Sequence, residues 1–123
     1  GILGFSLYPH HLKNNTNCTL DSFCEMIART SDIMNIKNIG IGSDLCLNQP
    51  DEIVEWMRNG TWSKNKNYGE GSKNKPGFPK QPGWFEDARG FFNIEKGLRK
   101  VGFSEEETNG ILGNNWYNFY RNI

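Results

Sequence analysis

Two apolar stretches with an amphipathic stretch between them dominate the first third of the chain. Residues 2–8 are almost continuously apolar, as in a strand covered on both faces, and residues 39–44 begin with isoleucines that alternate with glycine. Between them, apolar residues recur every three or four positions over residues 20–34, after a capping Thr19, which predicts a helix. A helix that connects two strands makes them parallel neighbours, so the order predicts an α/β fold.

The end of the second strand carries the first candidate for chemistry, Asp44. In parallel α/β folds catalytic groups gather where strands end, which predicts a catalytic Asp44, and a turn aspartate that caps the next helix is the alternative. The first strand ends at Tyr8, because the following Pro9 cannot donate to a strand ladder. The loop with His10 and His11 is therefore predicted at the same edge. Adjacent histidines on a regular strand cannot both point at one metal, so we expect substrate contact, by His10, rather than metal ligation.

The middle of the chain predicts one short helix and one long loop. Pro50 suits the first turn of a helix and Gly60 suits its end, so residues 50–60 are predicted to be helical. Residues 61–83 are rich in Lys, Asn, Gly and Pro, which is typical of a loop without a core of its own. Loops of this length are usually functional lids or lack fixed structure, and a subunit contact is a further alternative.

Helical patterns return over residues 84–102, where Gly102 predicts the stop. The apolar residues expected to cover the sheet are Phe85, Ala88, Phe91, Phe92, Ile94, Leu98 and Val101. Ser104 and Glu107 have the spacing of a capping box, which makes this glutamate structural. A last helix over residues 111–120 is predicted to be interrupted near residues 113–115.

Composition narrows the class of protein. A chain of 123 residues is one domain at most, and we expect residues 1–123 to belong to a single domain with the long loop, residues 61–83, inside it. Lys plus Arg and Asp plus Glu both number 14, which argues against nucleic acid or an anionic membrane as a partner. Three cysteines are an odd number, so we expect reduced thiols and a reducing compartment such as the cytoplasm. No apolar run is long enough for a transmembrane segment, and residues 1–5 lack a start methionine, so the chain is expected to begin within a longer protein.

Several stretches carry a resemblance to a known family. Gly-Ile-Leu-Gly-Phe-Ser-Leu-Tyr at residues 1–8, Gly-Ile-Gly-Ser-Asp at 40–44, Gly-Phe-Ser-Glu-Glu-Glu at 102–107 and Gly-Asn-Asn-Trp at 113–116 resemble the closing part of the membrane (renal) dipeptidase family of zinc peptidases. The resemblance implies the C-terminal part of a metal-dependent amidohydrolase-type (β/α)8 barrel. Residues 2–8 would be its seventh strand and residues 38–44 its eighth.

The resemblance also implies an activity and roles for residues. Family members hydrolyse the peptide bond of dipeptides, often with a D-residue at the C-terminal position, and use two zinc ions. Asp44 matches the aspartate that relays a proton from the attacking water to the leaving amine, and Tyr8 matches the tyrosine that helps to hold the substrate carboxylate. The zinc ligands of the family lie in parts of the barrel outside this chain, so no metal ligand is assigned here.

Two departures from the family leave the substrate preference open. Cys46 stands where many members have a second acidic residue, and Asn118 stands where they have an arginine. A non-catalytic binding or scaffold domain and another amidohydrolase-type metal-dependent hydrolase remain as alternatives. The isolated chain is expected to be inactive on dipeptides and to associate with itself or with the rest of the barrel, because the edge of its first strand is open.

Overall fold

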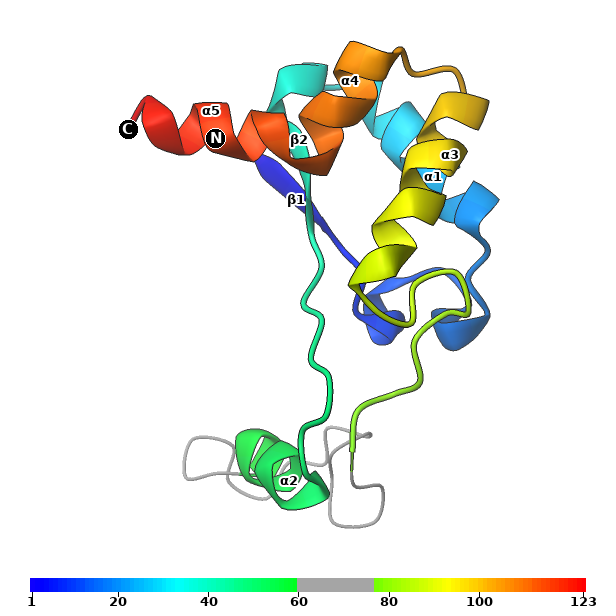
Figure 1. The fold of residues 1–123 in the computed structure, drawn as a ribbon, viewed down its shortest axis with the longest axis vertical. Helices are drawn as coiled ribbons and strands as arrows, with labels where there is room; N and C mark the ends of the chain where they lie inside the picture. The colour runs from blue at the N-terminus through cyan, green and yellow to red at the C-terminus, as the bar shows by residue number, and fades with distance from the viewer. Residues whose placement is uncertain (60–76) are drawn as a thin grey trace. The chain divides into compact units, whose positions relative to one another are not determined.

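The computed structural model describes residues 1–59 and 77–123, without the side chains of residues 58 and 59. These residues form two compact units, one made of residues 1–45 and 81–123 and the other within residues 46–80 (Figure 1). The first unit contains the strands β1 (Leu3–Ser6) and β2 (Ile39–Gly42), and the second contains the helix α2 (Asp51–Asn59).

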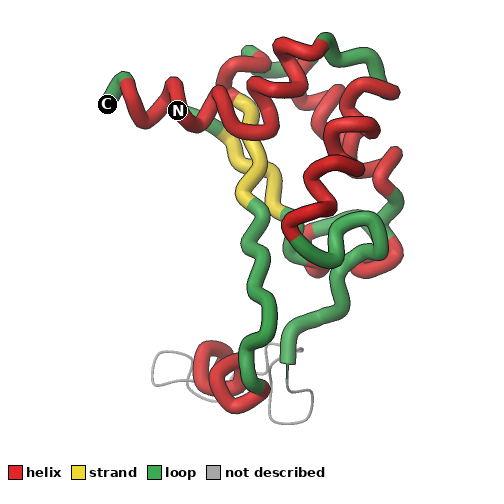
Figure 2. The backbone as a smooth tube through the Cα atoms, viewed as in Figure 1, coloured by secondary structure: helices red, strands yellow, loops and turns green. Residues whose placement is uncertain are grey.

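The two strands form a parallel pair, shown in yellow in Figure 2, with α1 (Leu20–Ser31) between them in sequence. Leu3 faces Ile39 and Ser6 faces Gly42, which confirms the predicted order of strand, helix and strand. Both strands are shorter than predicted. The first stops because the 3-10 helix η1 (Pro9–His11) follows it, and the second stops because Asp44 leaves the extended region with a φ of 51°.

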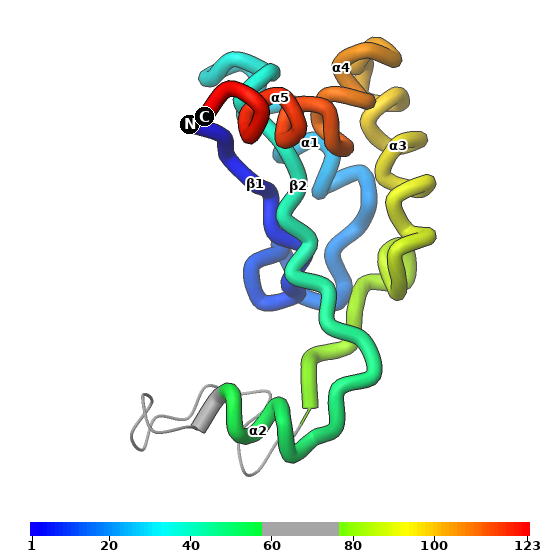
Figure 3. The backbone as a smooth tube through the Cα atoms, turned by 60° about the vertical axis from the view of Figure 1, so that its left-hand side comes forward, coloured from blue at the N-terminus to red at the C-terminus, as the bar shows by residue number. Residues whose placement is uncertain are grey.

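The buried residues of α1 are Phe23, Cys24 and Ile27, and they share one hydrophobic core with Phe5 and Ile39 of the two strands. Its start is confirmed, because the Thr19 side chain accepts the backbone N–H of Ser22 at 3.1 Å. The helix α3 (Phe91–Lys100) packs beside it, as Figures 1 and 3 both show. The contact is close, because a Cβ on Gly97 would lie 2.6 Å from the Cys24 sulfur. The main core lies between these helices and the strands.

The apolar pattern of residues 84–102 is confirmed in part. The 3-10 helix η4 (Ala88–Gly90) precedes α3, and Phe85, Ile94 and Leu98 are buried. The prediction that Ala88 and Phe92 cover the sheet is wrong, because Ala88 is exposed and Phe92, on the opposite side of α3 from the core, is 67% exposed. Gly102 has a φ of 109°, and the N–H of Phe103 donates to the Leu98 carbonyl at 3.2 Å, which ends the helix as predicted.

The last third of the chain contains two local features that the sequence predicts. Ser104 and Glu107 form the capping box of α4 (Glu105–Asn109), with bonds of 2.8 and 3.2 Å. The helical segment that follows is interrupted by a π-turn, η5 (Gly110–Asn114), before α5 (Asn115–Arg121). Gly113 has non-helical dihedral angles there, so the predicted interruption is confirmed.

The second unit contains the short helix predicted after Pro50. The Pro50 carbonyl accepts the N–H groups of Ile53 and Val54, and the Val54 side chain is buried. Residues 60–76, which include the predicted stop and most of the predicted loop, lie outside the described residues. Residues 77–83 contain no helix or strand.

The three cysteines are free thiols, as expected. Cys18 and Cys24 are buried, and burial, followed by the charge of Asp21, raises the pKa of the Cys24 thiol to about 12. This thiol is therefore protonated and packs as an apolar group. Over residues 1–59 and 77–123, no helix combines the length and apolar character needed to span a membrane.

Candidate functional site at the strand ends

The ends of β1 and β2 place two of the predicted site residues at equivalent positions. Ser6 and Gly42 are the last paired residues of the register, and Tyr8 and Asp44 each follow two residues later. Because the strands are parallel, both residues lie at the same edge of the sheet, where the C-terminal ends of the strands meet. This edge is the candidate functional site.

The end of β1 is a cluster of polar and aromatic side chains. Ser6 Oγ accepts the backbone N–H of Tyr8 at 3.1 Å and lies 2.9 Å from His11 Nδ1. The Tyr8 ring meets the His10 and His11 rings edge to face, with centroid distances of 5.5 and 5.2 Å. Tyr8 is buried, whereas both histidines are exposed. The structure therefore brings Tyr8 and His10 together, as predicted.

Two side chains of this cluster are assigned no role of their own by the sequence pattern. Ser6 enters the prediction only as part of an apolar strand, and His11 only as the neighbour of His10 in the same loop. The available signal for Ser6 is its spacing, because residues two apart in a strand lie on the same face, so Ser6 shares a face with Tyr8.

The end of β2 presents an exposed carboxylate. Asp44 is exposed and has a φ of 51°, a left-handed conformation in which aspartate and asparagine are enriched. The backbone therefore leaves the extended conformation of the strand at Asp44. Asp44 does not cap a following helix, because α2 begins only at Asp51, so that alternative interpretation is wrong.

The start of α5 contacts β2 within the first unit. The Asn115 side-chain amide donates to the carbonyls of Ile36 and Ile39 at 2.9 and 2.8 Å. The Trp116 indole N–H donates to the Ile41 carbonyl at 3.1 Å. The sequence predicts the helix but gives no sign of these bonds, which join residues more than 70 positions apart.

The described residues do not form a metal site. Within residues 1–59 and 77–123, no three His, Cys, Asp or Glu side chains gather closely enough to hold a metal ion. His10 and His11 are adjacent at the end of β1, and the ring nitrogen Nδ1 of His11 is already directed to Ser6. These residues therefore do not fit a zinc centre on their own.

Comparisons with known proteins give one match, to a solved structure. No protein-family model matches the chain, and no curated protein matches it in sequence. The crystal structure of an amidohydrolase from Pseudomonas aeruginosa matches 94% of this chain with a TM-score of 0.73 and 24% identity. The chain has an amidohydrolase-like fold. It spans only 34% of the length of that protein, which is consistent with part of a (β/α)8 barrel. The likeness concerns the fold, and the narrower resemblance to the renal dipeptidases stays a prediction.

Proposed function

We propose that these residues are the C-terminal part of a zinc-dependent dipeptidase of the amidohydrolase type, in which β1 and β2 are the last two barrel strands. The observation that carries the proposal is the placement of Tyr8 and Asp44, one after each of two paired parallel strands. Active sites of (β/α)8 barrels lie at this end of the strands. The amidohydrolase-like fold supports the same assignment.

Asp44 is proposed as the group that moves a proton. A carboxylate can accept a proton from the attacking water and then donate it to the departing amine, so one group serves both steps. The exposed position of Asp44 suits this role, because the carboxylate must be reached by both water and substrate. Its left-handed backbone is a conformation that aspartate adopts at lower cost than most residues.

Tyr8 is proposed to bind the terminal carboxylate of the dipeptide, with His10 beside it. The backbone of Tyr8 is bonded to Ser6, and its ring is flanked by two histidine rings. A side chain that is held in this way orients a substrate at a lower entropic cost than a mobile one. The imidazole of His10 can donate an additional hydrogen bond to a carboxylate.

The resemblance implies zinc. Side chains outside the described residues would hold it, because the described residues do not fit a zinc centre. The roles of Asp44 and Tyr8 are therefore proposed for the complete protein. They concern proton transfer and substrate binding, and neither requires a metal ligand from this chain.

Assay of the complete protein on dipeptides, including dipeptides with a C-terminal D-residue, tests the proposal. We expect hydrolysis of the peptide bond and about two zinc ions per chain by elemental analysis, as for two-metal hydrolases. Absence of both hydrolysis and zinc would favour the non-catalytic binding or scaffold domain. Zinc with hydrolysis of a different amide or ester would favour another amidohydrolase-type enzyme.

A further inference from the structure

The strand pair carries glycines on the face opposite to its core residue Phe5, and a tryptophan from α5 lies on that face. Gly4 and Gly40 face each other in the register. The Trp116 indole lies directly on both, since a Cβ on Gly40 would overlap its Nε1 and a Cβ on Gly4 would lie 3.0 Å from its Cζ2. Any larger residue at Gly40 would therefore displace the ring.

Two consecutive residues of α5 donate hydrogen bonds to three backbone carbonyls, one just before β2 and two within it. Asn115, which is 9% exposed, bonds the carbonyls of Ile36 and Ile39, and Trp116 bonds that of Ile41. Buried amide groups must be hydrogen-bonded to avoid a desolvation penalty, so the Asn115 bonds are costly to break. Together these bonds fix the path of β2 almost to its end.

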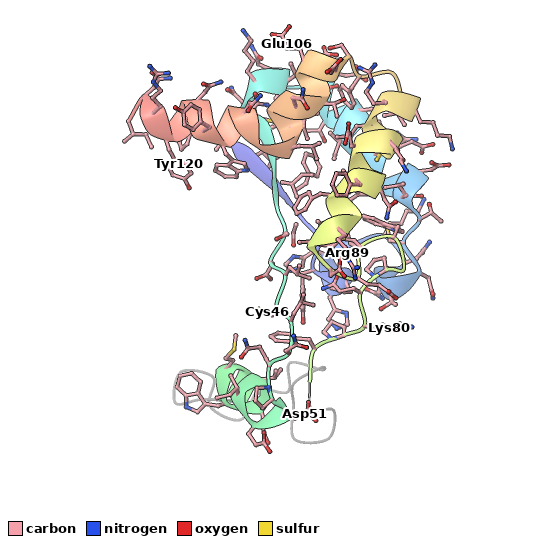
Figure 4. The ribbon with its side chains drawn as sticks, viewed as in Figure 1. Cys46, Asp51, Lys80, Arg89, Glu106 and Tyr120 are labelled. Atoms are coloured by element: carbon pink, nitrogen blue, oxygen red, sulfur yellow. The ribbon has the colours of Figure 1, made fainter. Side chains whose placement is uncertain are left out.

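The position of Trp116 is itself determined by its neighbours. Tyr120, labelled in Figure 4, stacks on the indole with a centroid distance of 5.8 Å and an angle of 18° between the rings. The π-turn η5 ends immediately before Asn115, and its first residue, Gly110, lies so close to the Asn115 side chain that a Cβ there would be 2.9 Å from Oδ1. A π-turn changes the direction in which the side chains after it leave the helix.

We propose that Trp116 is a positioning residue for Asp44. The bond from Trp116 is accepted by the Ile41 carbonyl, three residues before Asp44 and next to the last residue of β2. The indole therefore restrains the backbone from which the chain leaves β2 toward Asp44. The consequence for catalysis rests on the proposed function of Asp44, whereas the restraint on the β2 backbone does not.

The chain provides a matched control for a test in the complete protein. Trp116→Phe retains an aromatic ring on the glycines and removes the N–H donor. Trp84→Phe removes the same kind of bond elsewhere in the first unit, because the Trp84 indole N–H donates to the Cys18 carbonyl at 2.7 Å. Gly40→Ala displaces the indole without changing Trp116 and serves as a second variant.

The first readout is hydrogen exchange of the backbone amides of β2, residues 39–42, which pair with β1. We expect roughly tenfold faster exchange in Trp116→Phe, as for loss of one hydrogen bond, and no change at these amides in Trp84→Phe. Gly40→Ala should accelerate the same amides. Equal acceleration at residues 39–42 in Trp116→Phe and Trp84→Phe, or none in either, would overturn the proposal.

The second readout is the split between kcat and KM on a dipeptide. We expect Trp116→Phe to lower kcat about tenfold and to leave KM within about twofold, because a displaced proton-transfer group affects the transition state more than binding. Trp84→Phe should change neither constant. If the wild-type protein hydrolyses no dipeptide, the proposed function fails, and selectively faster exchange at residues 39–42 still supports the restraint of β2 by Trp116.

Discussion

The ends of β1 and β2 lie at the same edge of the sheet, but they are held in different ways. At the end of β1, Ser6 bonds the Tyr8 backbone and His11, and the rings of the cluster contact one another. At the end of β2, Asp44 is exposed and has a left-handed backbone conformation, and the restraint on its strand comes from Trp116, in a helix far along the sequence. One end is fixed by its own loop and the other by the C-terminal helix.

This difference fits two kinds of task. A group that orients a substrate benefits from a fixed ring and backbone, as Tyr8 has. A group that accepts and then donates a proton must be accessible to water and to the leaving group, as Asp44 is. The comparison therefore assigns binding to the end of β1 and proton transfer to the end of β2. It also predicts that substitutions at the first end cost stability, whereas substitutions at the second do not.

Leu7→Ala should have the largest effect on stability. Leu7 lies between Ser6 and Tyr8 and is completely buried in the core, so its truncation should lower the free energy of unfolding by about 2–5 kcal/mol. Ile33→Ala, at a residue that is 87% exposed, is the control and should cost less than about 0.5 kcal/mol. Denaturant unfolding measures both. Similar costs would show that the first strand end is not anchored in the core.

Tyr8→Phe should change binding more than turnover. Loss of one hydrogen bond to a substrate carboxylate is worth about 1.5–3 kcal/mol, which corresponds to an increase in KM of roughly 10- to 150-fold. Steady-state kinetics on a dipeptide measures it. A fall in kcat with an unchanged KM would place Tyr8 on the transition state and would remove the division of tasks between the two ends.

Ser6→Ala should cost about 1–3 kcal/mol of unfolding free energy, because it leaves the Tyr8 N–H without its acceptor. Ser6→Thr retains the hydroxyl and should recover most of this loss. Thermal or denaturant unfolding of the two variants separates the hydrogen bond from simple packing. Equal stability of the alanine and threonine variants would argue that the hydroxyl does not hold the first end.

Local signals predict much of the fold, and contacts between distant residues account for most of what they miss. The Thr19 cap, the Ser104 capping box and the stop at Gly102 each depend on residues within a few positions, so the sequence identifies them. Phe92 is misassigned because an apolar residue in a helix does not by itself reveal which side is covered.

In the candidate site, too, local signals predict some features and contacts between distant residues account for the others. The positions of Tyr8 and Asp44 at strand ends follow from the order of elements along the chain. The contribution of Trp116 depends on a bond to Ile41, 75 residues earlier, and on the space above two glycines that the indole fills. Neither is visible in the periodicity of the last helix. Strand length is also overestimated, because the left-handed backbone of Asp44 depends on dihedral angles that the apolar pattern does not specify.

Asp44→Asn tests the central claim most directly, with the smallest expected effect on stability and the largest on catalysis. In the complete protein, kcat on a dipeptide should fall at least about 100-fold, because an amide cannot relay a proton. The free energy of unfolding should change by less than about 0.5 kcal/mol, since Asp44 is exposed. Asp32→Asn, at an exposed aspartate after α1, should leave both quantities unchanged. Unchanged turnover in a folded Asp44→Asn variant would contradict the account.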